Sequence, residues 1–131
     1  SYTMEFTKYA EAPANILVKY RDPTSLARRI KDELRQLPPA RWPETSAQAQ
    51  ALSISASTLR RRLADEGQTY QALKDAVRKE LATTWLADAG VGVAEIAERL
   101  GFADTSSFYK AFRKWSGCNP GHYRSLMLAS G

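Results

Sequence analysis

Residues 93–124 read VAEIAERLGFADTSSFYKAFRKWSGCNPGHYR. The apolar positions among the first eight of these residues recur at helical spacing, which predicts a short amphipathic helix. Gly101 follows, and because glycine adopts a positive φ without steric cost, we expect the helix to end there in a turn. Asp104 is a good N-cap for a second helix, which Gly117 ends. Two short helices joined by a glycine-containing turn describe a helix-turn-helix.

The second of these helices has an apolar side and a polar side. At about 100° per residue, Phe108, Phe112 and Trp115 fall within roughly 40° of one another and are predicted to face the core. Ser106, Lys110 and Arg113 fall on the opposite side, with Tyr109 and Lys114 at its edges. Such a helix could lie in a major groove of DNA. From this helix alone, an ordinary solvated basic face is an equal alternative.

A longer pattern covers residues 101–124. It runs Gly-Phe-Ala-Asp-x-Ser-x-Phe-x-Lys-x-Phe-Arg-Lys-x-x-Gly-x-x-Pro-x-x-Tyr-Arg. This pattern resembles the signature of the AraC/XylS family of bacterial transcription regulators. The resemblance implies an all-α, homeodomain-like DNA-binding domain of AraC type, in which two helix-turn-helix subdomains are joined by one long connecting helix. A second unit is therefore expected upstream.

The sequence contains this upstream unit as an internal duplication. Three apolar positions repeat at a constant offset, namely Ala49, Leu52 and Ile54 with Ala97, Leu100 and Phe102. Two more repeat at an offset one residue longer, namely Leu59 and Leu63 with Phe108 and Phe112. Residues 46–52 and 56–66 are thus expected to be the two helices of the first unit.

The second helix of this first unit also has an outward polar face. Ser55 can cap the helix and Gly67 can end it. When Leu59 is placed inward, polar and basic side chains fall on the outer face and its edges: Ser57, Thr58, Arg60, Arg61 and Arg62. Arg60 and Arg61 are the best candidates for bidentate contacts with guanine, because their planar donor forks match the O6 and N7 acceptors of that base.

The turn of the first unit departs from the family pattern at one position. Ser53 stands where the family usually has glycine. If this residue is left-handed, serine costs on the order of 1 kcal/mol relative to glycine. A different turn geometry would avoid that cost, and the sequence leaves both possibilities open.

A long helix is expected between the two units. Thr69 can cap it, apolar residues recur every four positions from Leu73 to Trp85, and the helix extends to about Ala89. About 20 residues correspond to roughly 30 Å of helix, which is close to the turn of B-DNA at about 34 Å. A strut of that length could hold two recognition helices in successive major-groove turns.

The expected domain organisation is one DNA-binding domain over residues 23–131. Its first helix-turn-helix covers about 45–67, its connecting helix about 69–89 and its second helix-turn-helix about 93–117. Residues 1–22 are expected to be an N-terminal arm, or a linker from a sensor domain that the resemblance implies and this sequence lacks.

Further elements are expected on either side of the two units. Residues 16–20 could form a short strand. Asp22 or Thr24 can cap a helix whose apolar positions are Leu26, Ile30, Leu34 and Leu37. Trp42 is expected to anchor a core rather than to stack on a base. Asn119 and Pro120 can begin a last helix, with Tyr123, Leu126 and Met127 on its apolar side.

Composition and charge narrow the function classes. The 131 residues suit one domain with its own core, and the net charge of +5 and pI near 9.5 favour an anionic partner. The single cysteine rules out an internal disulfide and a cysteine-rich zinc site. With one histidine and no phosphate loop, nucleophile elbow or dinucleotide motif, the sequence predicts neither an enzyme nor a bound cofactor or metal. No apolar run is long enough for a membrane span, and no signal peptide opens the sequence.

The sequence thus favours sequence-specific binding of double-stranded DNA by a bacterial transcription regulator. The side chains expected at DNA are Ser57, Thr58, Arg60, Arg61, Thr105, Ser106, Tyr109, Lys110 and Arg113. A helical module that uses the same basic faces on an acidic protein is the alternative, and a helical RNA-binding module is a weaker third. The resemblance further implies a cytoplasmic, nucleoid-associated protein that contacts RNA polymerase and responds to an effector only through the missing N-terminal domain.

Overall fold

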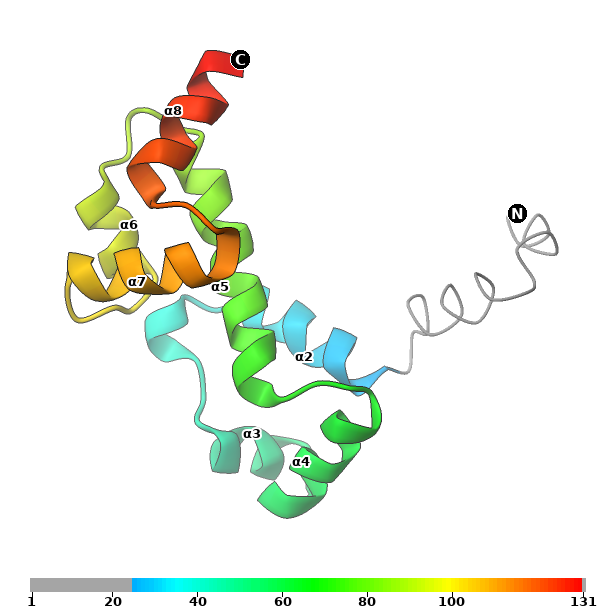
Figure 1. Cartoon of the computed structure of the whole chain (residues 1–131). Helices are drawn as coiled ribbons and strands as arrows, with labels where there is room; N and C mark the ends of the chain where they lie inside the picture. Colours follow the sequence, from blue (N-terminus) through cyan, green and yellow to red (C-terminus); the bar gives the residue numbers. More distant parts are fainter. Residues whose placement is uncertain (1–24, 131) are drawn as a thin grey trace, which may run out of the picture.

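The computed structural model describes residues 25–130, and this part of the chain is helical throughout (Figure 1). It has seven α-helices, one 3-10 helix and no strand. In chain order these are α2 (Leu26–Arg35), the 3-10 helix η2 (Pro39–Arg41), α3 (Thr45–Ala51), α4 (Ala56–Asp65), α5 (Tyr70–Leu86), α6 (Val93–Arg99), α7 (Thr105–Ser116) and α8 (Pro120–Ser130). The strand expected over residues 16–20, and the arm or linker expected over residues 1–22, lie outside the described residues.

The long helix α5 connects two helical units. Figure 1 shows α3 and α4 beside one end of α5, and α6 and α7 beside its other half. The helix α2 packs along α5, and α8 packs against both α5 and α7. The all-α architecture with two helix-turn-helix units and a connecting helix, expected from the sequence, is therefore the observed one.

The first hydrophobic core lies between α2, α4 and the N-terminal half of α5. Its central side chains are completely or almost completely buried: Ile30, Leu34, Leu59, Leu63, Leu73 and Val77. Trp42 packs against this core and donates its indole N–H to the carbonyl of Leu34 at 2.8 Å, as the sequence led us to expect of a core anchor. The Tyr70 hydroxyl donates to the Pro43 carbonyl at 2.7 Å, and burial raises the pKa of Tyr70 to about 12.

The second core is built around aromatic rings. Phe108 and Phe112 from α7 are fully buried, with their ring centroids 5.8 Å apart. Phe102 packs against Phe108 at 5.6 Å, and Tyr123 of α8 meets Phe112 edge-on at 5.4 Å. Ala82 and Leu86 supply the α5 side of this core. Aromatic pairs at these separations are in the range that favours tilted and edge-to-face packing.

The connecting helix is shorter than the expected span of about 69–89. Thr69 caps α5 as predicted, its side chain accepting from the Ala72 N–H at 3.0 Å, but the helix ends at Leu86. Its 17 residues correspond to about 26 Å rather than roughly 30 Å. The end is stabilised by Arg124 of α8, which donates to the Leu86 carbonyl at 2.9 Å and also reaches the carbonyls of Trp85, Asp88 and Val91. The helix therefore ends before Gly90, and a distant arginine binds the carbonyls at its end.

Two expectations about the flanking helices are wrong in detail. The cap of α2 is Ser25, not Asp22 or Thr24, and Leu37 lies beyond the helix end with 42% of its surface exposed. The start of α2 is stabilised by Glu66, whose carboxylate accepts from the Leu26 and Ala27 N–H groups at 2.9 and 3.1 Å. In α8 only Tyr123 of the expected apolar side packs inward, since exposed apolar side chains follow it at Leu126, Met127 and Leu128.

The turns of the two helix-turn-helix units have related backbone geometry. Gly101 has a φ of 88°, as expected for the residue that follows the first helix of its unit. Ser53, at the matching position, has a φ of 61° and is the one non-glycine residue with positive φ in the described part of the chain. The left-handed alternative considered for Ser53 is thus the observed one, and serine is strained there because its β-carbon crowds the backbone.

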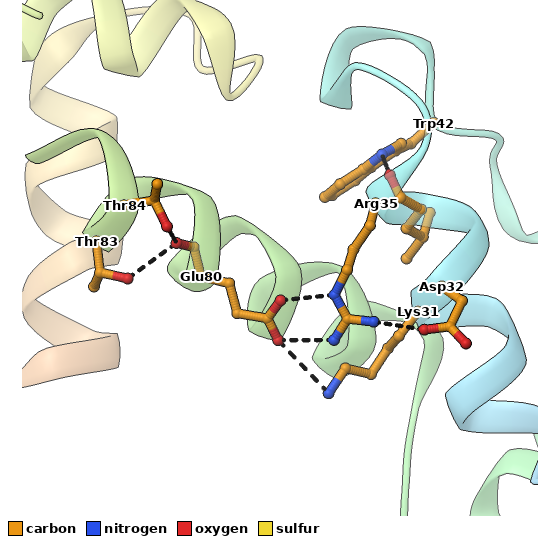
Figure 2. Close-up of polar contacts among 8 residues, drawn as sticks. Lys31, Asp32, Arg35, Trp42, Glu80, Thr83 and Thr84 are labelled. Atoms are coloured by element: carbon orange, nitrogen blue, oxygen red, sulfur yellow. Dashed lines mark hydrogen bonds and ion pairs between the residues drawn. The ribbon is translucent and has the colours of Figure 1, made fainter.

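An ion-pair cluster attaches α2 to α5 on the surface of the first unit (Figure 2). Arg35 donates from Nε and Nη2 to the two carboxylate oxygens of Glu80 at 2.8 and 3.0 Å, and from Nη1 to Asp32 at 2.8 Å. Lys31 lies 3.9 Å from Glu80. The hydrogen bonds from Arg35 lower the pKa of Glu80 below its ordinary value of 4.5. Bidentate geometry fixes the crossing of the two helices more specifically than a single contact would.

We predict that Ser53→Gly stabilises the protein by roughly 0.5–1 kcal/mol, because glycine adopts this left-handed conformation without the steric cost that serine has. Urea denaturation followed by circular dichroism measures the change. Ser46→Gly is the matched control, since Ser46 is exposed and lies within α3. Glycine at that helical position is expected to lower the stability. Equal destabilisation by both substitutions would contradict the argument.

We predict that Glu80→Gln lowers the unfolding free energy at pH 7 by about 0.5–1 kcal/mol, a value limited by solvent screening of this partly exposed pair. Because the pKa of Glu80 is lowered in the folded state, its stabilisation is present above pH 4.5 and is lost as the pH falls through the folded pKa. Denaturation of both proteins between pH 7 and pH 3 should therefore converge at the acid end. Glu98→Gln, at an exposed site without an ion pair among the described residues, should show no such convergence.

Candidate nucleic-acid interface

The outer face of α4 begins at a hydroxyl cluster. Ser55 caps the helix as predicted, with its hydroxyl oxygen accepting from the Thr58 N–H at 3.1 Å. The Ser55 hydroxyl also donates to Thr58 Oγ1 at 2.9 Å. The distance between Ser55 Oγ and Ser57 Oγ is 3.2 Å. Ser57 is exposed and Thr58 is half-buried. The hydroxyl of Thr58 therefore keeps its own proton free to donate, whereas one of its acceptor positions is occupied.

The arginines of α4 are exposed and unpaired within the described part of the chain. Leu59 and Leu63 are buried at 0 and 1% exposure, which turns Arg60, Arg61 and Arg62 toward solvent. No carboxylate in residues 25–130 forms an ion pair with any of the three. The three guanidinium groups add their attraction for a nearby anion. This face is therefore ready to bind an anionic partner without first breaking internal pairs.

The outer face of α7 begins differently, at a carboxylate. Asp104 caps the helix as predicted and accepts from the Ser107 N–H at 2.7 Å. This backbone hydrogen bond, followed by one from the Ser107 side chain, lowers the pKa of Asp104 below its ordinary value of 3.8. The cap is therefore negatively charged at neutral pH. Gly117 ends the helix with a φ of 86°.

The remaining candidate residues of α7 differ in how far they face solvent. Ser106, Lys110 and Arg113 are exposed, whereas Thr105 and Tyr109 are half-buried. The Tyr109 ring meets the ring of the neighbouring Phe108 edge-on at 6.4 Å, so this side chain is partly held against its own helix. Neither Lys110 nor Arg113 has an ion-pair partner among the described residues. All nine sequence-predicted residues thus lie on two helices that occupy equivalent places in the duplicated units.

The two outward faces differ in charge at their helix N-termini. The neutral Ser55 leaves the positive end of the α4 dipole uncompensated, whereas the Asp104 carboxylate offsets that of α7. The basic side chains of α4 are consecutive, and those of α7 are distributed over its later turns at Lys110, Arg113 and Lys114. The positive potential is therefore concentrated more strongly on α4.

Within 25–130, no group of three or more histidine, cysteine, aspartate or glutamate side chains is arranged to hold a metal ion. None of the helices there is both long and apolar enough to cross a membrane.

The sequence reasoning missed the structural role of Arg78. Its guanidinium lies close to Trp42 and Phe102, at 5.0 and 5.8 Å from the two ring centroids. The available signal was a basic residue directly after the buried Val77 on a helix shared by both units. Helical spacing cannot show which rings surround such a residue, because they come from loops.

Comparisons with known proteins agree with this geometry. The sequence model described as "Helix-turn-helix domain" matches residues 48–125. The ornithine utilization regulator of Pseudomonas aeruginosa is 44% identical over 86 residues, covering 66% of this chain and 25% of that protein. The transcriptional regulator VirS of Mycobacterium tuberculosis is 33% identical over 107 residues, covering 82% of this chain and 32% of that protein.

Solved structures show the same fold. The transcriptional regulator CdpR from Pseudomonas aeruginosa superposes with a TM-score of 0.71 and 43% sequence identity, covering 76% of this chain and 31% of that chain. A DNA-binding transcriptional dual regulator from Escherichia coli K-12 superposes with a TM-score of 0.73 at 22% identity, covering 79% of this chain and 92% of that chain. At 22% identity the second comparison supports the fold alone.

Proposed function

Because the chain belongs to the AraC-type helix-turn-helix family of transcription regulators, which are not enzymes, we propose that it binds double-stranded DNA in a sequence-specific manner. In this proposal α4 and α7 enter successive major-groove turns on one face of the duplex. The observation that carries the proposal is the duplication: each unit turns a helix with unpaired basic side chains toward solvent and buries its opposite side. A single basic face could bind any polyanion. Two equivalent faces joined by α5 favour a polyanion whose binding sites repeat at a regular interval, as the major groove of duplex DNA does.

We propose that α4 is the main base-reading helix. The exposed forks of Arg60 and Arg61 can each donate two hydrogen bonds to the O6 and N7 of a guanine. Ser57 and Thr58, in the first turn of the helix, add short donors that reach a base edge or a phosphate oxygen. The uncompensated positive end of the helix dipole supports binding of a phosphate there.

We propose that α7 depends more on phosphate contacts. Lys110 acts on phosphate largely as a point charge, and Arg113 lies about one turn further along the same face. The possible base readers of this helix are short or hydroxyl-bearing: Thr105, Ser106 and Tyr109. The Asp104 carboxylate at the helix N-terminus disfavours a phosphate at that end. Phosphate contacts of this kind position a protein on the duplex but carry no sequence information.

The chain spans between a quarter and a third of the length of the two regulators named above, at 25 and 32%. We therefore propose, as properties of a longer protein, that residues 23–131 are its DNA-binding domain and that residues 1–22 are an arm or a linker from a sensor domain. An effector would act through that sensor domain, and RNA polymerase would be a further partner. Such a regulator would work in the cytoplasm in association with the nucleoid.

The proposed function predicts a footprint of two separated segments. One chain bound to a duplex selected from a random library should protect two major-groove segments about one helical turn apart on one face. The measurement is hydroxyl-radical footprinting at limiting protein, combined with determination of the number of chains per duplex. One protected segment, a requirement for two chains per site, or preference for single-stranded RNA would count against the proposal.

The different roles proposed for α4 and α7, base reading and phosphate contact, predict different effects of two alanine substitutions. Arg61→Ala should weaken binding to the selected duplex by about 1–3 kcal/mol and relax the base preference at one position. Lys110→Ala should weaken binding to selected and random duplexes by similar factors, and should make the salt dependence about one unit shallower. Salt titrations of both duplexes measure these effects.

Lys79→Ala is the control for this pair, since it removes an exposed charge from α5 without an ion-pair partner in residues 25–130. If Lys110→Ala abolished the preference for the selected duplex while sparing random DNA, α7 would be a base reader. Equal loss on all sequences after Arg61→Ala would instead assign that residue to phosphate.

A further inference from the structure

We propose that Arg78 is a positioning residue that fixes the orientation of α4 relative to α7, so that the two outward faces bind one duplex as a rigid pair. This inference rests on the proposed function for its biological meaning, but the orientation itself is a property of the free protein. The observation that carries it is that Arg78, on the shared helix α5, contacts both units at once.

The guanidinium of Arg78 lies over one ring from each unit. Its central carbon is 5.0 Å from the centroid of Trp42, which packs against the first core, and 5.8 Å from that of Phe102, which packs against the second core. Both distances are within the roughly 6 Å over which a cation is attracted to an aromatic face. The cation therefore bridges two cores that the chain builds separately.

Polar contacts hold the guanidinium in this place. Its Nε donates to the carbonyl of Leu100 at 3.4 Å, and Nη1 lies 3.5 Å from the Asp75 carboxylate one turn earlier on α5. Leu100 is the C-terminal cap of α6, where helix carbonyls have no partner within the helix. Only 19% of the Arg78 side chain is exposed, so these interactions are less screened by water than those of a surface arginine.

The backbones of the two units also meet beside Arg78. A β-carbon added to Gly101 would lie 3.9 Å from the backbone of both Pro39 and Ala40. The turn of the second helix-turn-helix thus lies against η2, and in Figure 1 the cyan segment that follows α2 runs beside the α6–α7 unit. Without this second point of attachment, α5 alone would hold the units, and bending or twisting of one helix would change their relative orientation.

Lysine is not equivalent to arginine at this position. The guanidinium is planar and can stack against two rings while donating within its plane, whereas an ammonium group is a compact, strongly hydrated point charge. At this site the guanidinium of Arg78 contacts two rings, donates to Leu100 and forms an ion pair with Asp75. We therefore expect the Arg78→Lys protein to fold normally but to hold α4 and α7 in a less fixed relative orientation.

The first test measures orientation without DNA. Spin labels at Ala47→Cys and Ala94→Cys, in a Cys118→Ser background, place one probe on an exposed position of each unit. Pulsed electron paramagnetic resonance should give one narrow distance distribution for the parent protein, and broader or shifted distributions for Arg78→Ala and Arg78→Lys. A distribution unchanged by both substitutions would overturn the inference, whatever the protein does with DNA.

The second test compares a selected duplex with the same duplex after one of its two protected segments has been scrambled. The second contact is intramolecular, and its effective concentration is highest when the two units are held in the correct orientation. Arg78→Ala should lower this effective concentration and so weaken binding to the intact duplex about tenfold. Binding to the scrambled duplex should change less than about twofold, and the penalty for inserting one base pair between the segments should shrink. Arg78→Lys should change these quantities in the same direction, and its smaller structural change keeps the test valid if the alanine variant unfolds.

Arg99→Ala is the matched control, because Arg99 also lies over a ring, Trp85 at 5.1 Å, but within the second unit only. For Arg99→Ala, the ratio of the affinity for the intact duplex to the affinity for the scrambled duplex should equal the ratio measured with the parent protein. Equal losses on both duplexes after the Arg78 substitutions would show a merely structural role and overturn the inference. Broadened distances in the Arg78 variants, together with a parent protein that does not prefer the selected duplex, would instead leave Arg78 as the positioning residue and refute the proposed function.

Discussion

The structure depends on one helix that is buried in two cores at once. The first half of α5 gives Leu73 and Val77 to the core of the first unit, and its second half gives Ala82 and Leu86 to that of the second. The spacing changes from four residues to five between Val77 and Ala82, so the buried stripe moves around the helix from one unit to the other. Neither helix-turn-helix can bury its apolar side without α5. The two outward faces are therefore attached to one element.

The helix ends are stabilised by contacts of very different range. Ser55 and Asp104 cap α4 and α7 from within three residues, and these local hydrogen bonds set the start of each recognition helix. Glu66 and Arg124 act across about 40 residues, the first at the N-terminus of α2 and the second at the C-terminus of α5. Long-range caps connect the flanking helices to the central units, so that the position of α2 and the length of α5 depend on the complete fold.

The basic side chains divide by whether they have partners. Arg35 and Arg78 bind carboxylates or rings and connect elements of the fold. Arg61, Lys110 and others on the outer faces of α4 and α7 have no ion-pair partner within residues 25–130. Net charge alone could not make this distinction, because it counts both groups equally. The unpaired group is the one that supports the proposed interface with DNA, since binding there breaks no internal ion pair.

The sequence by itself determined the local features of this protein. Helical periodicity identified the buried sides of α4 and α7, the caps Ser55 and Asp104 followed from short-range chemistry, and the duplication predicted two equivalent units. Tertiary structure alone decided that α5 ends at Leu86, that the apolar residues near the ends of α8 and α2 stay exposed, and that Arg78 contacts a ring from each unit. The physical reason is range: caps and periodicity act within one or two turns of chain, whereas these outcomes depend on groups that meet only after both cores have formed.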